Sequence, residues 1–194
     1  TPIFLICGCQ KYRPYLDAAV KRYANPARWI TIGLLGDPTV TEARLEIAGS
    51  NGSYLLTVPN PDTYETLPAK IHAGIEWIHK TWPQAPGIFK TDDDILFPDR
   101  PLLERTIRMY RSQAYWGLYV SRCPEASIPR MRIESRFTDK SADREYRHQA
   151  ATYCFGAGYW IGAQSIPVVV AAKDVFAASV LEDVCMGFVL NQVG

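Results

Sequence analysis

Three consecutive carboxylates, Asp92, Asp93 and Asp94, follow an apolar, strand-like run at 87–91. Like charges repel, and apolar surroundings raise that cost unless a cation or hydrogen-bond donors neutralise the charges. Oxygen ligands without a neighbouring Cys or His suit hard divalent ions such as Mn²⁺ or Mg²⁺, which usually also hold phosphates. The cluster therefore indicates a metal-assisted phosphate site. The alternative is an acidic turn that caps a helix starting near Pro98.

Two further features favour chemistry over a simple cap. Lys90 precedes the turn and can offset part of its charge, and a second acidic pair, Glu182 and Asp183, lies in the apolar stretch "VLEDVCMGFVL". A carboxylate in such surroundings either caps the dipole of a helix N-terminus or serves as a general base. Both interpretations of the second pair stay open from the pattern alone.

The glycine-rich segment "GAGYWIG" at 156–162 differs from a dinucleotide-binding fingerprint. Its glycine spacing is wrong, and it lies late in the chain instead of after the first strand. Gly156 and Gly158 would allow the backbone to approach a ligand closely, with Trp160 or Tyr159 as a stacking surface for a sugar or a base. Alternatively, these residues pack at a bend in a strand.

Strand-like and helix-like segments alternate along the chain. The strand-like runs are 3–7, 29–35, 54–58, 87–91 and 114–120, and the helix-like ones are 15–24, 63–82 and a segment after Pro98 that turns Leu102, Leu103, Ile107 and Tyr110 inward. This alternation predicts an α/β fold with a mostly parallel central sheet flanked by helices on both faces. Ligands of such sheets gather beyond the carboxyl ends of the strands, which is where the acidic turn falls.

The composition indicates one folded domain of 194 residues, with 47% hydrophobic residues and a net charge of +1. So small a charge argues against nucleic acid as a partner. We interpret the five cysteines mostly as buried thiols, with a Cys123–Cys154 disulfide as the alternative. Ten charged residues at 130–148 predict an exposed loop, either a solvated face or a lid over a ligand.

Three blocks in order resemble the β-1,3-galactosyltransferase and Fringe-like family of glycosyltransferases. They are "DTYETLPAKIHAGIEWIHKTWPQAPGIFKTDDDILF", "YCFGAGYWIG" and "LEDVCMGFVL", and together they cover roughly residues 60–194. The opening third matches loosely. It lacks the family's "R-x-x-x-R-x-T-W" region, for which Arg13, Lys21 and Arg22 are basic stand-ins.

The resemblance implies a GT-A (Rossmann-like) fold over 1–194 that binds a UDP-sugar through Mn²⁺ (or Mg²⁺). Residues 1–98 would form the nucleotide-binding part, ending in the Asp-x-Asp turn, and residues 99–194 the acceptor-binding part. The expected reaction moves a galactose- or glucose-type hexose to a hydroxyl of a glycan or glycoprotein acceptor with inversion. Two other functions stay open, a non-catalytic nucleotide-sugar or glycan-binding module and a metal-dependent nucleotide phosphohydrolase.

The resemblance also implies roles for individual residues. Asp183 would be the catalytic base and Glu182 its supporter or an acceptor contact, and Asp94 and Asp92 would bind the metal. The expected nucleotide-sugar contacts are Asp92, Asp93, Lys70, Lys90, Gly156, Gly158 and Trp160. Family members commonly add a histidine metal ligand after the "E-D-V" helix, but His72, His79 and His148 all precede it.

No transmembrane segment is expected, because no run approaches 18 apolar residues. The start of the chain also lacks the features of a signal peptide. We therefore expect a soluble domain, either cytoplasmic and of viral or microbial origin, or excised from a luminal enzyme of the secretory pathway.

Overall fold

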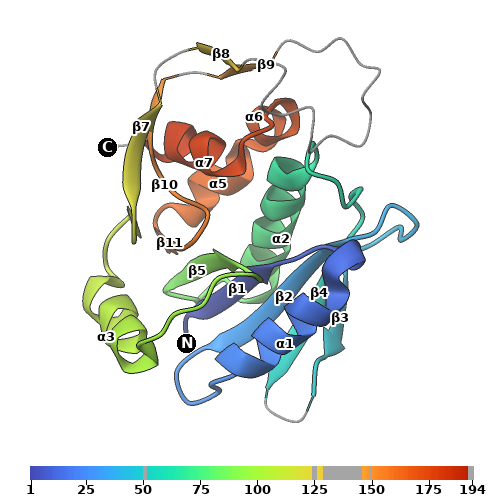
Figure 1. The fold of residues 1–194 in the computed structure, drawn as a ribbon, viewed down its shortest axis with the longest axis vertical. Helices are drawn as coiled ribbons and strands as arrows, with labels where there is room; N and C mark the ends of the chain where they lie inside the picture. Colours follow the sequence, from blue (N-terminus) through green and yellow to red (C-terminus); the bar gives the residue numbers. More distant parts are fainter. Residues whose placement is uncertain (50–51, 124–125, 129–145, 149, 192–194) are drawn as a thin grey trace.

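A seven-stranded sheet runs through the centre of the computed structural model, which describes residues 1–49, 52–123, 126–128, 146–148 and 150–191 (Figure 1). Its strand order is β3-β4-β2-β1-β5-β11-β6. The strands are β1 (Ile3–Cys7), β2 (Ile30–Gly36), β3 (Arg44–Ile47), β4 (Ser53–Val58), β5 (Gly87–Asp92), β6 (Tyr115–Gly117) and β11 (Tyr159–Gly162). Two small two-stranded sheets pair β7 (Val120–Cys123) with β10 (Ala151–Cys154) and β8 (Ala126–Ile128) with β9 (Tyr146–His148).

The centre of the large sheet is parallel and its margins are antiparallel. β4, β2, β1 and β5 run parallel to one another. β3 pairs antiparallel with β4, and β11 pairs antiparallel with both β5 and β6. The predicted α/β fold is confirmed, and the complete sheet is mixed. β3, which the sequence pattern did not predict, is mostly exposed, as an edge strand can be.

Helices cover both faces of the sheet, as predicted (Figure 1). The apolar cluster on one face takes residues from α1 (Arg13–Tyr23) and α3 (Arg100–Tyr110). The cluster on the other face takes residues from α2 (Leu67–Thr81), α5 (Ile166–Ala171), α6 (Lys173–Ala178) and α7 (Glu182–Asn191). A short 3-10 helix, η1 (Gln10–Tyr12), leads from β1 into α1.

Side chains of the inner strands alternate between these two clusters. In β1, Ile3 and Leu5 belong to the cluster beneath α2, whereas Phe4 and Ile6 belong to the cluster beneath α1. All four are completely buried. Because both faces are covered, the strand reads as a continuous apolar run instead of an alternating one.

Helix α2 begins later than its apolar periodicity suggested, at Leu67 instead of residue 63. The preceding residues form a turn in which the Thr66 hydroxyl donates a hydrogen bond to the Pro61 carbonyl at 2.6 Å. Pro68 lies in the first turn of α2, where the backbone N–H group that a proline lacks would have no helical partner. The helix therefore starts only after the turn at residues 61–66.

Helix α3 buries a narrower face than predicted. Leu103 and Ile107 are 4% exposed, whereas Leu102 and Tyr110 are each 45% exposed. The Asp99 carboxylate caps the helix by accepting a bond from the Leu102 N–H at 2.8 Å. Asp99 is therefore the capping carboxylate, which leaves the acidic turn before it without that role.

Two other expectations concern the later part of the chain. In the β7–β10 pair, Cys154 lies opposite Val120, and Cys123 lies opposite Ala151, so the alternative Cys123–Cys154 disulfide is not formed. Cys7, Cys154 and Cys185 are buried thiols, as predicted. The expected lid lies largely within 129–145, outside the described residues.

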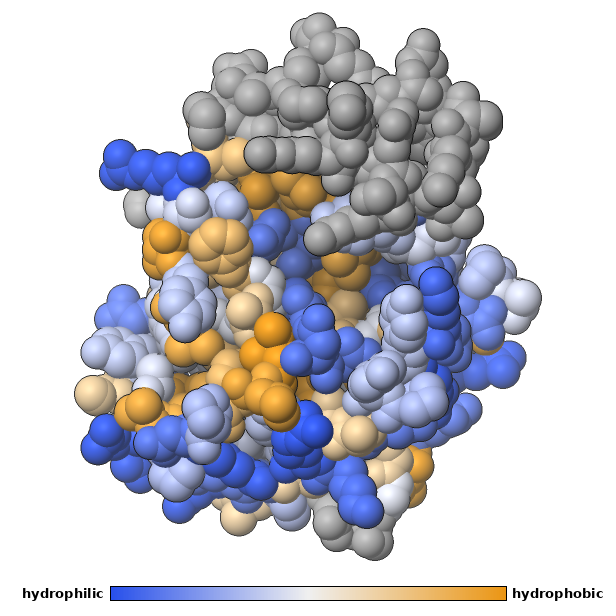
Figure 2. All heavy atoms as spheres, in the orientation of Figure 1, coloured by the Kyte–Doolittle hydropathy of each residue, from blue (hydrophilic) through white to orange (hydrophobic). Residues whose placement is uncertain are grey.

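Hydrophobic residues gather on the face seen in Figure 2, over the connection from β5 to α3 and near the start of β7. The exposed large apolar side chains of these connections include Leu96, Tyr119 and Val120, each 63–66% exposed.

Over the described residues, no helix is both long and apolar enough to cross a lipid bilayer.

Helix α7 packs on β10 at a glycine. A Cβ atom added to Gly187 would lie 2.5 Å from the Thr152 carbonyl oxygen and 2.5 Å from the Cβ of Tyr153. Because one of these neighbours is backbone, it cannot move aside cheaply. The hydrogen in place of a side chain therefore sets how closely α7, which carries Glu182 and Asp183 in its first turn, approaches the strand.

We predict that Gly187→Ala lowers the free energy of unfolding by about 1–3 kcal/mol, the usual cost of overpacking. Urea denaturation followed by circular dichroism measures the change. Val175→Ala, on the partly exposed helix α6, is the control and should stay within about 0.5 kcal/mol of the parent. Equal stability of Gly187→Ala and the parent would contradict the close packing.

Candidate active site at the carboxyl edge of the sheet

The acidic turn lies where the sequence analysis expected it, at the carboxyl end of β5. Asp92 ends the strand opposite Cys7 of β1, and the Asp93 N–H donates to the Cys7 carbonyl at 3.0 Å. The Ile95 N–H then donates to the Asp92 carbonyl at 3.3 Å, which closes the turn. Pairing with a buried inner strand therefore fixes the start of the turn.

The three aspartates of this turn have different surroundings. Asp92 forms an ion pair with Lys90, with 2.8 Å between Oδ1 and Nζ. Asp93 packs towards Gly8, and its Oδ2 is buried without a hydrogen-bond partner. Burial, followed by repulsion from Asp94 and Asp92, raises the pKa of Asp93 to about 6. The Asp94 side chain is exposed.

Lys90 lies at the centre of the site and is 1% exposed. Its ammonium group contacts Asp92 Oδ1 at 2.8 Å, Glu182 Oε2 at 3.1 Å and the Gly156 carbonyl at 3.3 Å. Burial lowers the pKa of Lys90, but attraction from Asp92 and Glu182 more than compensates, so the pKa is raised. The lysine is therefore a buried cation that joins β5, the 155–158 loop and α7.

Glu182 is held at both carboxylate oxygens. Oε2 accepts from Lys90, and Oε1 accepts a short hydrogen bond from the Tyr159 hydroxyl. Burial raises the pKa of Glu182, while the charge of Lys90 opposes that shift. Because both oxygens are occupied and the residue is 5% exposed, Glu182 is more suited to supporting its neighbour than to contacting an acceptor.

Asp183, the expected base, is only half-buried. Its Oδ1 accepts from the Val184 N–H at 2.9 Å. Burial raises its pKa, and backbone N–H groups of Val184 and Gly156 together with the charge of Lys90 oppose the shift. The Asp183 carboxylate is thus partly accessible to solvent and has a higher proton affinity than an ordinary aspartate. Both properties are expected of a general base.

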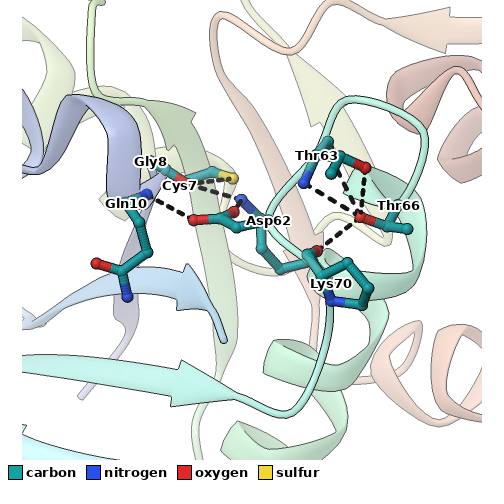
Figure 3. Close-up of polar contacts among 8 residues, drawn as sticks. Cys7, Gly8, Gln10, Asp62, Thr63, Thr66 and Lys70 are labelled. Carbon is teal, nitrogen blue, oxygen red and sulfur yellow. Dashed lines mark hydrogen bonds and ion pairs between the residues drawn. The ribbon is translucent and has the colours of Figure 1, made fainter. Parts of the chain in front are cut away.

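A second buried lysine lies beside the acidic turn. Lys70 Nζ donates to Asp62 Oδ1 and to the Gly8 carbonyl, both at 2.6 Å, and Asp62 Oδ2 accepts from the Gln10 N–H, also at 2.6 Å (Figure 3). Burial lowers the pKa of Lys70, but the charge of Asp62 and its hydrogen bond to the lysine raise it. This pair ties the β4–α2 connection to the end of β1.

Asp62 was missed by sequence reasoning, which singled out Lys70 without a partner. The sequence did offer one signal for this pair: Asp62 lies eight residues before Lys70, which falls on the apolar face of a helix. Tyr159 was named only as a stacking surface. Its position in β11 directly opposite Lys90 follows from the strand register, which one sequence does not reveal.

Gly156 lies close to the charged residues, whereas Gly158 and Trp160 pack against apolar side chains. A Cβ atom on Gly156 would lie 3.2 Å from Asp92 Oδ2 and 3.3 Å from Lys90 Nζ, and one on Gly158 would lie 3.0 Å from Phe89. Trp160 is completely buried in the cluster on the opposite face of the sheet. Its ring is therefore part of the core and is not open to a ligand.

The acidic turn offers the donor atoms that a hard divalent cation prefers. It offers carboxylate oxygens alone, including the exposed Asp94, and the buried oxygen of Asp93 lacks a partner. Within the described ranges, no three His, Cys, Asp or Glu side chains converge as a ready metal site. The protein would therefore supply few ligands, as Mg²⁺ sites that also hold substrate phosphates commonly do.

An α/β sheet with a parallel centre, helices on both faces and an acidic turn at its carboxyl edge is consistent with a GT-A glycosyltransferase. The family model described as "Galactosyltransferase" matches residues 49–194, which is more than half of the chain. The protein therefore belongs to the galactosyltransferase family, a family of hexosyltransferases, and the resemblance of its three sequence blocks is confirmed.

Individual relatives are distant. The protein is 28% identical over 132 residues to beta-1,3-galactosyltransferase 5 of Pan troglodytes and to that of Homo sapiens. The match covers 68% of this chain, but 43% and 41% of those proteins. The chain thus matches less than half the length of these curated relatives.

Two ion pairs made by lysines of helix α2 allow a test of what burial contributes. Lys70–Asp62 and Lys80–Glu76 have nearly equal N–O distances, 2.6 and 2.7 Å, but the lysine side chains are 3% and 69% exposed. We predict that Lys70→Met costs about 3 kcal/mol or more, because it leaves the Asp62 carboxylate, 9% exposed, without its counter-ion. Lys80→Met, the control, should cost under about 1 kcal/mol.

Chemical denaturation of both variants measures the difference in unfolding free energy. Similar costs for the two substitutions would show that the buried pair does not hold the β4–α2 connection in place.

Proposed function

We propose that this protein transfers a galactose- or glucose-type hexose from a UDP-sugar to a hydroxyl group of a glycan or glycoprotein acceptor. The observation that carries this proposal is the arrangement of two acidic groups on either side of Lys90. One is the turn that ends β5, and the other is the Glu182–Asp183 pair that begins α7. Membership of the galactosyltransferase family supports the same reaction class.

The charge balance of the site suits an anionic donor that arrives with a divalent cation. Lys90 faces three carboxylates, those of Asp92, Glu182 and Asp183, and Asp93 and Asp94 follow Asp92 in the turn. We expect Asp94 and Asp92 to hold Mn²⁺ or Mg²⁺, since Asp94 is exposed and Asp92 has only Oδ1 paired with Lys90. When bound, such an ion neutralises negative charge on the leaving diphosphate.

Asp183 is the proposed catalytic base. It accepts the proton of the acceptor hydroxyl while that oxygen bonds to the anomeric carbon of the donor. The bond between this carbon and the diphosphate oxygen breaks, and UDP leaves with the electron pair. Attack from the side opposite the leaving group inverts the anomeric configuration. Glu182, fixed by Lys90 and Tyr159, holds the first turn of α7 in place for this step.

The acceptor would bind on the side formed by residues 99–194, and the nucleotide on the side formed by 1–98. Two exposed aromatic residues support this division, Tyr119 at 66% and Phe155 at 42% exposure. They are linked by a hydrogen bond from the Phe155 N–H to the Tyr119 carbonyl at 3.0 Å, next to the loop that contains Gly156. Exposed rings of this kind offer flat apolar surfaces to sugars.

Incubation with a panel of UDP-sugars, Mn²⁺ and glycan acceptors tests the proposal. We expect Asp183→Asn to lower kcat by about 10²–10⁴-fold, the usual contribution of a general base. Asp94→Ala should weaken Mn²⁺-dependent UDP binding in calorimetry. Asp174→Asn, on helix α6, is the control and should behave like the parent.

The products separate this function from its alternatives. Cleavage between the phosphates without an acceptor would indicate a phosphohydrolase. Binding without turnover would indicate a binding module. A product that retains the anomeric configuration of the donor would contradict in-line attack assisted by Asp183.

The pH dependence of transfer follows from the raised pKa of Asp183. A base acts in its deprotonated form, so kcat/KM should fall as the pH drops through a value above 3.8, the usual pKa of an aspartate. A kcat/KM–pH profile measures this acid limb, and Asp183→Asn should remove it from the residual activity. A limb at or below 3.8 would contradict the assignment.

A further inference from the structure

Lys90 has no hydrogen-bond donor left for a ligand. An ammonium group has three N–H donors, and those of Lys90 are matched by three acceptors, Asp92 Oδ1, Glu182 Oε2 and the Gly156 carbonyl. The side chain is 1% exposed. A direct bond from Lys90 to a donor phosphate would therefore require one of these contacts to break.

The three acceptors come from parts of the chain that are far apart. Asp92 ends β5, Gly156 is 66 residues further along the chain from Lys90, and Glu182 is 92 residues from it. One buried cation thus joins the proposed metal turn, the glycine loop and the first turn of the helix that carries Asp183. Its distance to each segment limits how far that segment can move from the other two.

Tyr159 completes this arrangement from the neighbouring strand. It lies directly opposite Lys90 in the β5–β11 register, and its ring centroid is 5.4 Å from Lys90 Nζ. Its hydroxyl donates to Glu182 Oε1, the oxygen that Lys90 does not reach. Glu182 is thereby fixed from two strands at once, and the adjacent Asp183 is fixed with it.

From these contacts we propose that Lys90 is a positioning residue, which sets the separation between the donor-binding turn and the base Asp183. It does so without touching the donor. This inference rests on the proposed function, because it assigns Asp92 to donor binding and Asp183 to proton transfer. It deepens that function by assigning the relative placement of the two groups to a single buried ammonium.

The decisive variant is the double substitution Lys90→Met with Glu182→Gln. Lys90→Met alone leaves Glu182 buried and unpaired and can reduce folding, whereas the second change removes that charge and keeps an acceptor for Tyr159. We expect kcat for transfer to fall about 100-fold, as misplacement of a reacting group does. The KM for the donor should rise by a much smaller factor than kcat falls, because every donor-binding aspartate of the turn is still present.

A second readout does not depend on activity. Amide hydrogen exchange should quicken at residues 92–95 and 182–185 in the double variant and stay unchanged in α1. Lys80→Met, which removes an exposed ammonium on α2, is the control for both measurements.

Three results would overturn the inference. A donor KM raised tenfold or more at unchanged kcat would show direct contact with the donor. Parent-like kcat in the double variant would show that the lysine matters for stability alone. Unchanged exchange at both segments would show that it does not hold them. If the parent itself transfers no sugar, the proposed function fails, and the exchange measurement alone then decides whether Lys90 joins the two segments.

Discussion

The site depends on one constraint, namely that a lysine ammonium removed from water must be neutralised by groups at fixed distances. Lys90 satisfies it with two carboxylates and a carbonyl from three segments of the chain. Losing any one of these three contacts would leave the buried charge less well neutralised, at a cost in free energy. The three segments are therefore held together at the carboxyl edge of the sheet. Lys70 and Asp62 repeat this arrangement at the neighbouring strand end.

The sheet makes both ion pairs possible. Parallel pairing of β1 with β5 brings Gly8 and the acidic turn to the same edge, and antiparallel addition of β11 brings Tyr159 opposite Lys90. Helix α7 then reaches this edge because Gly187 allows it to pack closely on β10. Buried charges, strand order and one close helix contact thus act together to place Asp183 near the acidic turn.

Much of the fold could be predicted from local patterns. The apolar run of β1 and the spacing of Leu67, Ile71 and Ile75 in α2 report burial directly, because strands and helices have fixed periods. The antiparallel margin of the sheet and the edge strand β3 could not be predicted. Pairing between distant strands leaves no periodic trace in either one, and a mostly exposed strand lacks the apolar pattern that marks an inner strand.

The sequence by itself determined which groups are present: an acidic turn after an apolar, strand-like run, a second acidic pair in an apolar stretch and a lysine beside the first. These follow from residue types and short spacings, which one chain displays in full. Only the tertiary structure decided that Lys90 faces Glu182 across 92 residues, that Asp62 pairs with Lys70, and that Trp160 lies in the core. The physical reason is that strand order and register set which face a side chain takes and which distant charge it meets.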